Sequence, residues 1–393
     1  MEGTKSVREP IGVYIHFPFC VKKCNYCDFL SGPANSEMRS AYVDALCREI
    51  RTFGGRRGAN EASRGNEKIR VDTVFLGGGT PSVMDPADLT RVMETVRETF
   101  DVLPGAEISM EMNPGTFRED LLAFVKKYMG RVSLGLQSAD DRELSLLGRI
   151  HTYAEFERCY EALRDAGIAN INVDLMSAIP GQTLASWVRT LSRVLEKRPE
   201  HISCYSLIVE EGTPFYALYE AGRLDLPDED EEREMYYETE RRMEAHGYHR
   251  YEISNYARPG HECRHNVRYW RRSPYAGFGI GAASLIDETR WNNTRDLQKY
   301  LCGSGSPGDI REDIQQLSVS EQMEEFMFLG LRMMEGVSAS DFAEAFSCEL
   351  DSVFGEACER LISEGLLVRE GDRYKLTSRG IDVSNAVLAE FLL

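Results

Sequence analysis

Residues 13–27 read Val13-Tyr-Ile-His-Phe-Pro-Phe-Cys20-Val-Lys-Lys-Cys24-Asn-Tyr-Cys27, an apolar, strand-like run followed by three cysteines on one loop. Iron–sulfur clusters are held by Cys thiolates, usually four of them, whereas this loop offers three. A cube of four irons bound by three thiolates keeps one iron open to another ligand, as in catalytic metal sites generally. The spacing therefore predicts a cluster on Cys20, Cys24 and Cys27. The alternatives are a structural zinc site, although no second Cys-x2–4-Cys pair follows, and three unrelated core cysteines.

The first half of the chain alternates short β-type runs with longer helical runs, which is typical of βα units on a parallel sheet. The six predicted strands span 13–17, 73–77, 107–112, 132–137, 170–175 and 202–207. The predicted helices span 37–53, 86–100, 118–128, 153–166 and 186–195. Six such units predict an α/β fold, a partial six-stranded (β/α) barrel. The polar stretch 54–68 is interpreted as a surface loop.

Several of these strands alternate in polarity. In residues 132–137, for example, Val132, Leu134 and Leu136 are separated by polar or small residues. Parallel strands that are buried on both faces should instead be continuously apolar. A period of two places the apolar residues against the helices and the others in a polar barrel lumen that holds a polar ligand. The alternative, an antiparallel sheet with one wet face, conflicts with the long helical connections.

The cysteine spacing resembles that of the radical S-adenosylmethionine (SAM) superfamily, in which three such cysteines bind a [4Fe–4S] cluster and SAM chelates the fourth iron. From Tyr14 onward the chain looks like the coproporphyrinogen dehydrogenase group of that superfamily, and most closely like the HemW-type heme chaperones. The resemblance implies that an electron donor reduces the cluster, and that an electron passed to SAM then cleaves a C–S bond.

The segment Gly77-Gly78-Gly79-Thr80-Pro81 follows the second predicted strand, at the strand end where barrel sites lie. Glycines there let the backbone approach a ligand closely, although they also suit a tight turn. The resemblance implies that this segment binds the SAM amino group. It also implies cofactor-binding roles for Tyr14, Tyr26, Gly78, Gly79, Thr80, Glu111, Gln137, Arg149 and Asp174. A buried ion pair with Arg149 is the alternative for either carboxylate.

The segment His265-Asn-Val-Arg-Tyr269-Trp270 matches the His-Asn-x-x-Tyr-Trp motif that is associated with heme binding in HemW-type chaperones. His is the usual proximal ligand of heme iron, and aromatic residues supply apolar area for a porphyrin face. His265 is therefore the predicted heme ligand. A hydrogen-bonded core histidine is the alternative interpretation.

Two departures separate this chain from the coproporphyrinogen dehydrogenases themselves. Those enzymes carry a fourth cysteine two residues beyond the third, where this sequence has Asp28 and Phe29. They also carry a long N-terminal extension, whereas 13 residues precede Tyr14 here. Oxidative decarboxylation of coproporphyrinogen III is therefore kept as the enzyme alternative, together with another SAM-radical reaction on a tetrapyrrole. A third hypothesis makes the cluster purely structural, without SAM.

From about Ser318 the pattern changes to helices followed by a hairpin, which predicts a winged-helix-like C-terminal domain. We divide the chain into a barrel core (1–215), an extension that carries the heme-associated segment (216–315) and this last domain (316–393).

The formal net charge of −18 argues against a nucleic-acid partner, whose phosphates require a basic face. No apolar run reaches the length of a membrane span, and the first residues lack the apolar region of a signal peptide. We expect a cytoplasmic protein that reaches the inner face of the membrane through its clients. The resemblance implies a chaperone that binds heme, or a porphyrin, and delivers it to heme-requiring respiratory membrane proteins. It is compatible with a homodimer.

Overall fold

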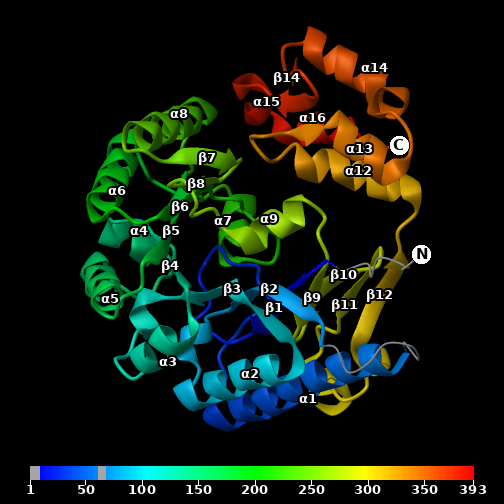
Figure 1. Cartoon of the computed structure of the whole chain (residues 1–393). Coiled ribbons are helices and arrows are strands. Elements are labelled where there is room, and N and C mark those ends of the chain that lie inside the picture. The colour runs from blue at the N-terminus through cyan, green and yellow to red at the C-terminus, as the bar shows by residue number, and fades with distance from the viewer. Residues whose placement is uncertain (1–8, 61–67) are drawn as a thin grey trace.

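The computed structural model describes residues 9–60 and 68–393. Six parallel strands follow one another in chain order and curve into an open barrel (Figure 1). These strands are β1 (Ile11–Phe17), β2 (Arg70–Gly78), β3 (Asp101–Met112), β4 (Arg131–Gln137), β5 (Asn170–Ser177) and β6 (His201–Ser206). Each pairs in parallel with the next. The predicted partial (β/α) barrel is confirmed.

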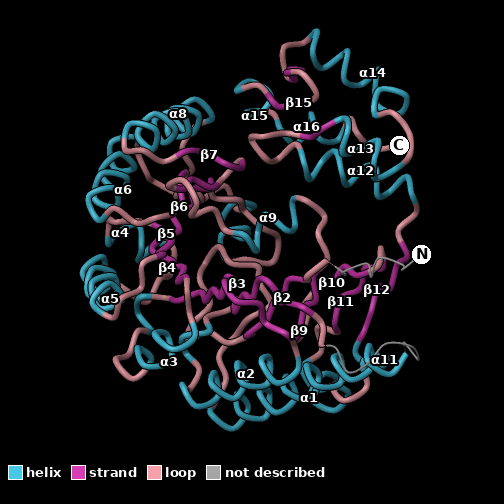
Figure 2. The backbone as a smooth tube through the Cα atoms, in the orientation of Figure 1, coloured by secondary structure: helices cyan, strands magenta, loops and turns pink. Residues whose placement is uncertain are grey.

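The connecting helices lie outside the arc of strands (Figure 2). They are α1 (Ser36–Asn60), α2 (Pro86–Thr99), α3 (Leu121–Tyr128), α5 (Tyr153–Asp165) and α6 (Leu184–Lys197), with the short turns η1 (Pro81–Val83), η2 (Pro114–Thr116) and α4 (Asp141–Leu146). The apolar side of each alternating strand faces these helices, and Val132, Leu134 and Leu136 are fully buried against them. The sequence pattern therefore fixed which face of each strand is packed.

The loop prediction for residues 54–68 is wrong over its first part, because α1 continues to Asn60. Gly54 is needed there for packing: a Cβ atom on it would lie 2.3 Å from Cγ2 of Thr99, at the end of α2. Residues 61–67 lie outside the described residues.

Additional strands extend the sheet at both edges. Next to β1 come β9 (Tyr275–Phe278), β10 (Ala283–Ile286), β11 (Thr289–Asn293) and β12 (Arg311–Gln316); next to β6 come β8 (Asn255–Ala257) and β7 (His249–Glu252). The helices of this region are α7 (Pro214–Glu220), α8 (Glu229–Ala245), α9 (Arg264–Trp270), α10 (Leu297–Gly303) and α11 (Pro307–Ile310). Both α9 and α7 lie within the arc of strands in this view (Figure 1).

The C-terminal part has an apolar core of its own, which includes Phe342, Phe354 and Phe391. Its elements are α12 (Val319–Gly330), β13 (Val337–Ser338), α13 (Ala339–Phe346), α14 (Leu350–Ser363), β14 (Leu367–Glu370), β15 (Arg373–Leu376), α15 (Ser378–Asp382) and α16 (Ser384–Ala389). Helices with a small antiparallel sheet form the predicted winged-helix-like unit. The domain boundaries at 215 and 315 stay a prediction. None of the helices over the described residues combines the length and the apolarity that a membrane span requires.

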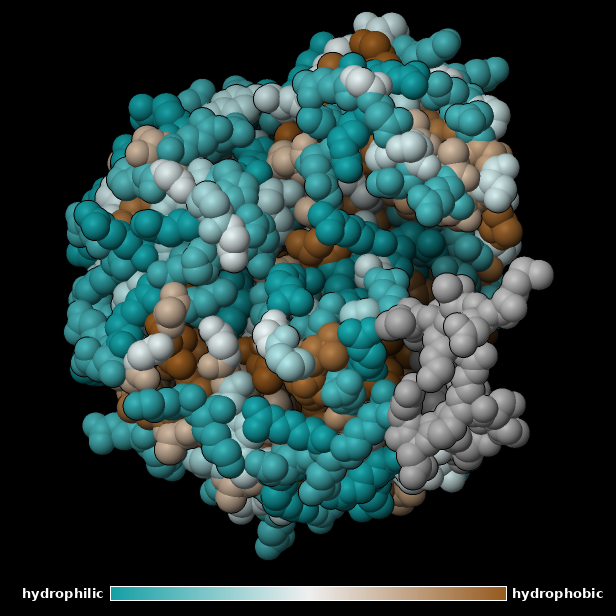
Figure 3. Space-filling view, viewed as in Figure 1, coloured by the Kyte–Doolittle hydropathy of each residue, from teal (hydrophilic) through white to brown (hydrophobic). Residues whose placement is uncertain are grey.

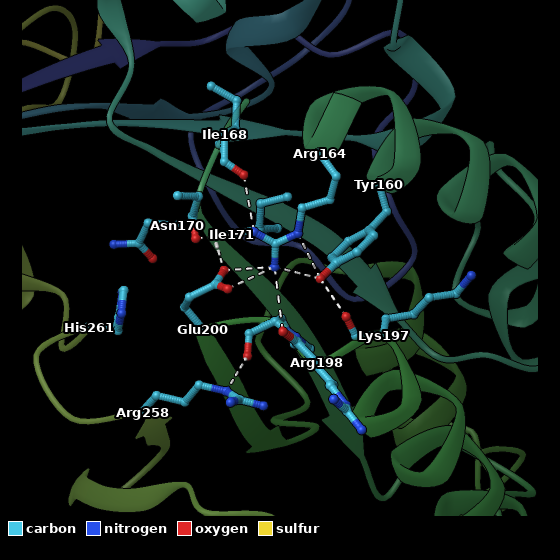
Figure 4. A network of polar contacts seen from close by, with 12 residues as sticks. Tyr160, Arg164, Ile168, Asn170, Ile171, Lys197, Arg198, Glu200, Arg258 and His261 are labelled. Atoms are coloured by element: carbon cyan, nitrogen blue, oxygen red, sulfur yellow. Dashed lines mark hydrogen bonds and ion pairs between the residues drawn. The ribbon is translucent and has the colours of Figure 1, made fainter. Parts of the chain in front are cut away.

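A partly buried ion pair connects the N-terminal ends of β5 and β6 (Figure 4). Arg164 of α5 donates to both carboxylate oxygens of Glu200, at 3.0 and 2.7 Å. Glu200 also accepts from the backbone N–H of Ile171, at 3.0 Å, and Arg164 donates to the carbonyl of Ile168, at 3.0 Å. One carboxylate thus connects α5 to the start of two neighbouring strands.

We expect Glu200→Ala to lower the free energy of unfolding by about 1–3 kcal/mol, because it removes the carboxylate partner of a partly buried guanidinium and the acceptor of a backbone N–H. Urea denaturation followed by circular dichroism measures the change. Glu98→Ala, which removes an exposed ion pair to Arg51 with an N–O distance of 3.7 Å, is the matched control and should have little effect. Equal effects of the two variants would contradict the assigned role of Glu200.

Candidate functional site

The cysteine loop is fixed to the glycines at the end of β2. The backbone N–H of Gly79 donates to the carbonyl of Phe17, at 2.8 Å. A Cβ atom on Gly79 would lie 2.7 Å from the carbonyl oxygen of Phe19, and one on Gly78 would lie 2.4 Å from the ring of His16. Gly78 also has a φ of +106°, which L side chains rarely adopt. Glycine is therefore required for the loop to dock on β2.

A cavity of about 490 Å³ opens beside this loop, at the C-terminal ends of the strands. Most of the predicted site residues line it: Cys20, Cys24, Tyr26, Cys27, Gly78, Gly79, Thr80, Glu111, Gln137, Arg149 and Asp174. Tyr14 and His265 do not. The cavity lies at the strand ends where active sites of parallel barrels are found.

The three cysteines of the loop are free, half-buried thiols. The sulfur of Cys20 lies 3.4 Å from the hydroxyl of Thr80, and the sulfur of Cys24 lies 3.6 Å from Nη1 of Arg149. Over residues 9–60 and 68–393, no three His, Cys, Asp or Glu side chains converge as the ligands of a single metal ion would. The thiolates of an iron–sulfur cube bind different irons, so they need no common centre. Three thiols around one cavity fit such a group.

Arg149 extends into the cavity with unused hydrogen-bonding capacity. Its Nη2 donates to the carbonyl of Gly135, at 2.5 Å, and its buried Nε has no hydrogen-bond partner among the described residues. Neither Glu111 nor Asp174 forms an ion pair with it in the described part of the chain. The alternative of a buried ion pair is therefore not what the structure contains, and the guanidinium of Arg149, which lines the cavity, keeps one buried N–H without an acceptor among the described residues.

Glu111 and Asp174 place two carboxyl groups on the same cavity. Oε2 of Glu111 accepts from the backbone N–H of Gly78, at 3.0 Å. Burial, and then the negative charge of Asp174, raise the pKa of Glu111 to about 8. Asp174 accepts from the Ser133 hydroxyl, at 2.9 Å, and from the Asn172 amide, at 2.7 Å. Two adjacent carboxyl groups favour a cationic ligand.

Gln137 occupies an unusual backbone position. Its φ is +73°, and the pairing of β4 with β5 shifts register between Gly135 and Gln137. Its Oε1 accepts from the hydroxyl of Tyr205, at 2.7 Å. Strained residues and bulges of this kind are concentrated at functional sites. Sequence reasoning missed Tyr205, which also lines the cavity, although the alternation of β6 could have placed it in the lumen.

Of the two predicted tyrosines, Tyr26 lines the cavity and Tyr14 does not. The hydroxyl of Tyr14 shares a hydrogen bond of 3.0 Å with Nδ1 of His16. Burial, and then the charge of Glu111, raise the pKa of Tyr14 well above its usual value. Tyr26 packs against an apolar cluster that includes Leu147 and Phe215, and burial raises the pKa of its hydroxyl. Tyr26 therefore anchors the cysteine loop to this apolar cluster.

His265 lies at the opposite end of the barrel lumen, on the short helix α9. Its Nδ1 is 2.9 Å from the hydroxyl of Thr73, and its Nε2 is 2.8 Å from the hydroxyl of Tyr269. The ring is 1% exposed and stacks on Phe75, with 5.2 Å between the ring centroids. Burial, and then the charge of Arg268, lower the pKa of His265 to about 3, so the ring is neutral. In this conformation both ring nitrogens are occupied.

A row of buried polar groups crosses the lumen between the two ends. The hydroxyl of Tyr251 lies 2.8 Å from Nε2 of His201, and Nδ1 of His201 lies 2.6 Å from Oδ1 of Asn172. The amide nitrogen of Asn172 then donates to Asp174. The polar lumen predicted from the strand alternation is thus filled by side chains that satisfy one another.

Comparison with known proteins agrees with this site. Residues 14–194 match the family described as the Radical SAM superfamily, and residues 317–383 match the HemN C-terminal domain. The coproporphyrinogen III oxidase HemN of Escherichia coli has a similar fold, with a TM-score of 0.83 at 23% identity over 98% of this chain and 90% of that chain. The fold and the cysteine cavity define a protein of the radical SAM superfamily.

Relatives of similar length narrow the classification. The heme chaperone HemW of Bacillus subtilis is 37% identical over 384 residues, which cover 96% of this chain and 98% of that protein. The heme chaperone HemW of Lactococcus lactis is 34% identical over 98% of both chains, and that of Escherichia coli is 30% identical over 98% of both. The chain belongs to the HemW family.

The pKa of Glu111 generates a testable pH dependence. Because the folded protein holds this proton more tightly than the unfolded chain, Glu111 destabilises the fold progressively as the pH rises from about 4.5 to about 8. In the protein without SAM, we expect Glu111→Gln to raise the free energy of unfolding by about 1–3 kcal/mol at pH 8.5, and by much less at pH 5. Chemical denaturation at both pH values measures this.

Glu119→Gln is the control, because Glu119 is an exposed carboxylate near the same end of the barrel. If Glu111→Gln raises the free energy of unfolding equally at both pH values, Glu111 does not titrate in this range.

Proposed function

We propose that Cys20, Cys24 and Cys27 hold a [4Fe–4S] cluster and that the adjoining cavity binds SAM. The donor set supports this, because the three thiols surround one cavity that also contains two carboxyl groups and a guanidinium. SAM carries a sulfonium, an ammonium and a carboxylate. The Glu111 and Asp174 side chains suit the two cationic groups, and the guanidinium of Arg149 suits the carboxylate.

When bound, the reduced cluster would supply one electron to the sulfonium. The protein itself would orient SAM and exclude water. The glycines after β2 keep the side of the cavity next to the cysteine loop free of side chains. Gln137, held by Tyr205, fixes the β4 edge of the cavity. Tyr26 forms one wall of the cavity and packs against the apolar cluster that includes Leu147 and Phe215. These residues would hold SAM in a single orientation against the open iron.

We further propose that the protein is a heme chaperone that delivers heme to heme-requiring membrane proteins of the respiratory chain. The observation that carries this proposal is the similarity to HemW proteins over almost the whole length of both chains. In this proposal the protein works in the cytoplasm, receives electrons from a separate donor and meets the membrane through its clients. The enzyme alternative is oxidative decarboxylation of coproporphyrinogen III.

Loss of one cysteine of the loop separates a cofactor cluster from a purely structural one. We expect Cys24→Ala to fold with an unchanged circular dichroism spectrum but to lose cluster absorbance, iron content and SAM binding after anaerobic reconstitution. The barrel core is built from apolar side chains and includes none of the three cysteines, so we expect it to form without the metal. Cys302→Ala, at an exposed cysteine, is the control. Unfolding of Cys24→Ala alone would favour a structural cluster.

Two measurements on the reconstituted wild-type protein test the chaperone proposal. In an anaerobic titration followed by visible absorption, we expect saturable binding of one heme per chain. In a turnover assay with coproporphyrinogen III, SAM and a reductant, we expect no protoporphyrinogen IX. Turnover without specific heme binding would make the tetrapyrrole enzyme the better description.

A further inference from the structure

A second, larger cleft lies at the other end of the barrel, where α9 and β7 meet the segment that follows α12. Its volume is about 700 Å³. A neighbouring cavity of about 450 Å³ shares Arg271, Ser273, Met333 and Glu335 with it, so the two border one another. None of the predicted cofactor-binding residues lines either cavity. The cleft is therefore distinct from the cysteine site.

The helix α9 presents a different set of residues to each side. Arg264, Val267 and Arg271 follow one another at three- and four-residue spacing and line the cleft. His265 and Tyr269, four residues apart, face the barrel lumen, where they hydrogen-bond to each other. The helix that carries the heme-associated motif thus turns its histidine away from the cleft.

The floor of the cleft is apolar. Tyr251 and Met333 are buried there in a cluster with Ala257, against which Val267 and Trp270 pack. Figure 3 shows apolar residues near the centre of this face, framed by hydrophilic ones, beneath the C-terminal part. An apolar floor inside a hydrophilic rim suits a flat, amphipathic ligand.

The rim carries two guanidinium groups that an anion can reach. Arg264 and Arg271 are two helical turns apart, and their side chains are 51% and 57% exposed. Arg264 donates to the carbonyl of Gly105, at 2.9 Å, and its Nη2 lies 4.0 Å from Asp72. Arg271 pairs with the exposed carboxylate of Glu335, at 2.8 Å, an interaction of the kind that contributes little in water. Arg268, between them, is committed to a buried ion pair with Asp72. Glu9, Asp72, Glu262 and Glu335 also line the cleft. The two exposed guanidinium groups are the positions where the cleft can meet two carboxylates of a ligand.

Few of the seven histidines can ligate an iron atom. Four are buried with each ring nitrogen within hydrogen-bonding distance of another polar group, namely His16, His151, His201 and His265. His246 lies at the exposed end of α8, and His261 lies beside the network of Arg164 and Glu200 (Figure 4). His249 lines the cleft.

His249 also has the surroundings of a metal ligand. Its side chain is 44% exposed, and Nε2 lies 2.8 Å from Oε1 of Glu262. Among the described residues, no hydrogen bond occupies Nδ1. Histidines that bind metals almost always donate the other ring N–H to a carboxylate or carbonyl, which orients the ring. Glu262 is placed to act in this way.

From these observations we infer that the cleft is the heme site: the macrocycle lies on the floor of Tyr251, Val267 and Met333, its two propionates meet Arg264 and Arg271, and Nδ1 of His249 ligates the iron. This inference rests on the proposed heme-chaperone function and specifies its site. It makes His265 a positioning residue, which anchors α9 in the barrel so that the opposite side of the helix faces the heme.

The test is an anaerobic heme titration of the full chain, followed by visible absorption, with the wild type and matched variants. His249→Gln should raise the Kd about tenfold or more and change the absorption spectrum that reports the axial ligand. His246→Gln should keep the wild-type Kd and spectrum. His265→Gln should raise the Kd by displacing α9 but should keep the wild-type spectrum. Circular dichroism shows which variants are folded.

A second pair of variants tests the rim. Arg264→Glu with Arg271→Glu should raise the Kd about tenfold or more, because two attractive contacts become repulsive. Arg142→Glu with Arg189→Glu changes the charge equally at exposed positions away from the cleft and should leave the Kd unchanged.

The outcomes separate the two proposals. If the wild type binds no heme, the proposed function fails. If the wild type binds heme but His265→Gln alone changes the spectrum, or if neither His249→Gln nor the rim variant weakens binding, heme binds elsewhere and the cleft assignment is overturned.

Discussion

The backbone hydrogen bonds between the cysteine loop and the end of β2 are the constraint on which the rest of the site depends. Gly79 and Thr80 donate to the carbonyls of Phe17 and Phe19, both at 2.8 Å, and thereby close the loop onto the neighbouring strand. This contact is available only because β1 and β2 are adjacent and parallel, so that both end at the same edge. It brings a cysteine motif and a glycine segment some sixty residues apart in the chain to the sides of one cavity.

The barrel could be predicted from the sequence because two independent patterns agree. Alternating residues define each strand, helical runs separate the strands, and the connections leave only a parallel order. The failure at 54–60 has a local cause. Glycine and arginine in that stretch are typical of a loop, but the glycine requirement comes from a tertiary contact of Gly54 with Thr99, which composition does not reveal.

In the candidate site, too, some features follow from the sequence pattern and others depend on tertiary contacts. The polar residues of the lumen were predictable because the strand register determines their side, and Glu111, Gln137 and Asp174 all line the cavity. The surroundings of His265 were not predictable. A helix of seven residues makes two turns, and nothing in its sequence says which side will enter the barrel. Hydrogen bonds from Thr73 and Tyr269 decide this, and Thr73 lies on a strand 192 residues earlier in the chain.

The polar row across the lumen has a fixed direction. Because the amide nitrogen of Asn172 donates to Asp174, its oxygen must accept, so His201 carries its proton on Nδ1 and Nε2 accepts from Tyr251. Every dipole in the row therefore points toward one carboxylate. Burial keeps His201 neutral by lowering its pKa well below the usual value. The hydrogen bonds of the row are therefore aligned, but the imidazole within it carries no charge. Tyr251 forms part of the floor of the cleft beside α9, and Asp174 lines the cavity beside the cysteine loop. Neutralising the carboxylate of Asp174 would therefore relax the tautomer preference of His201, which lies between the two.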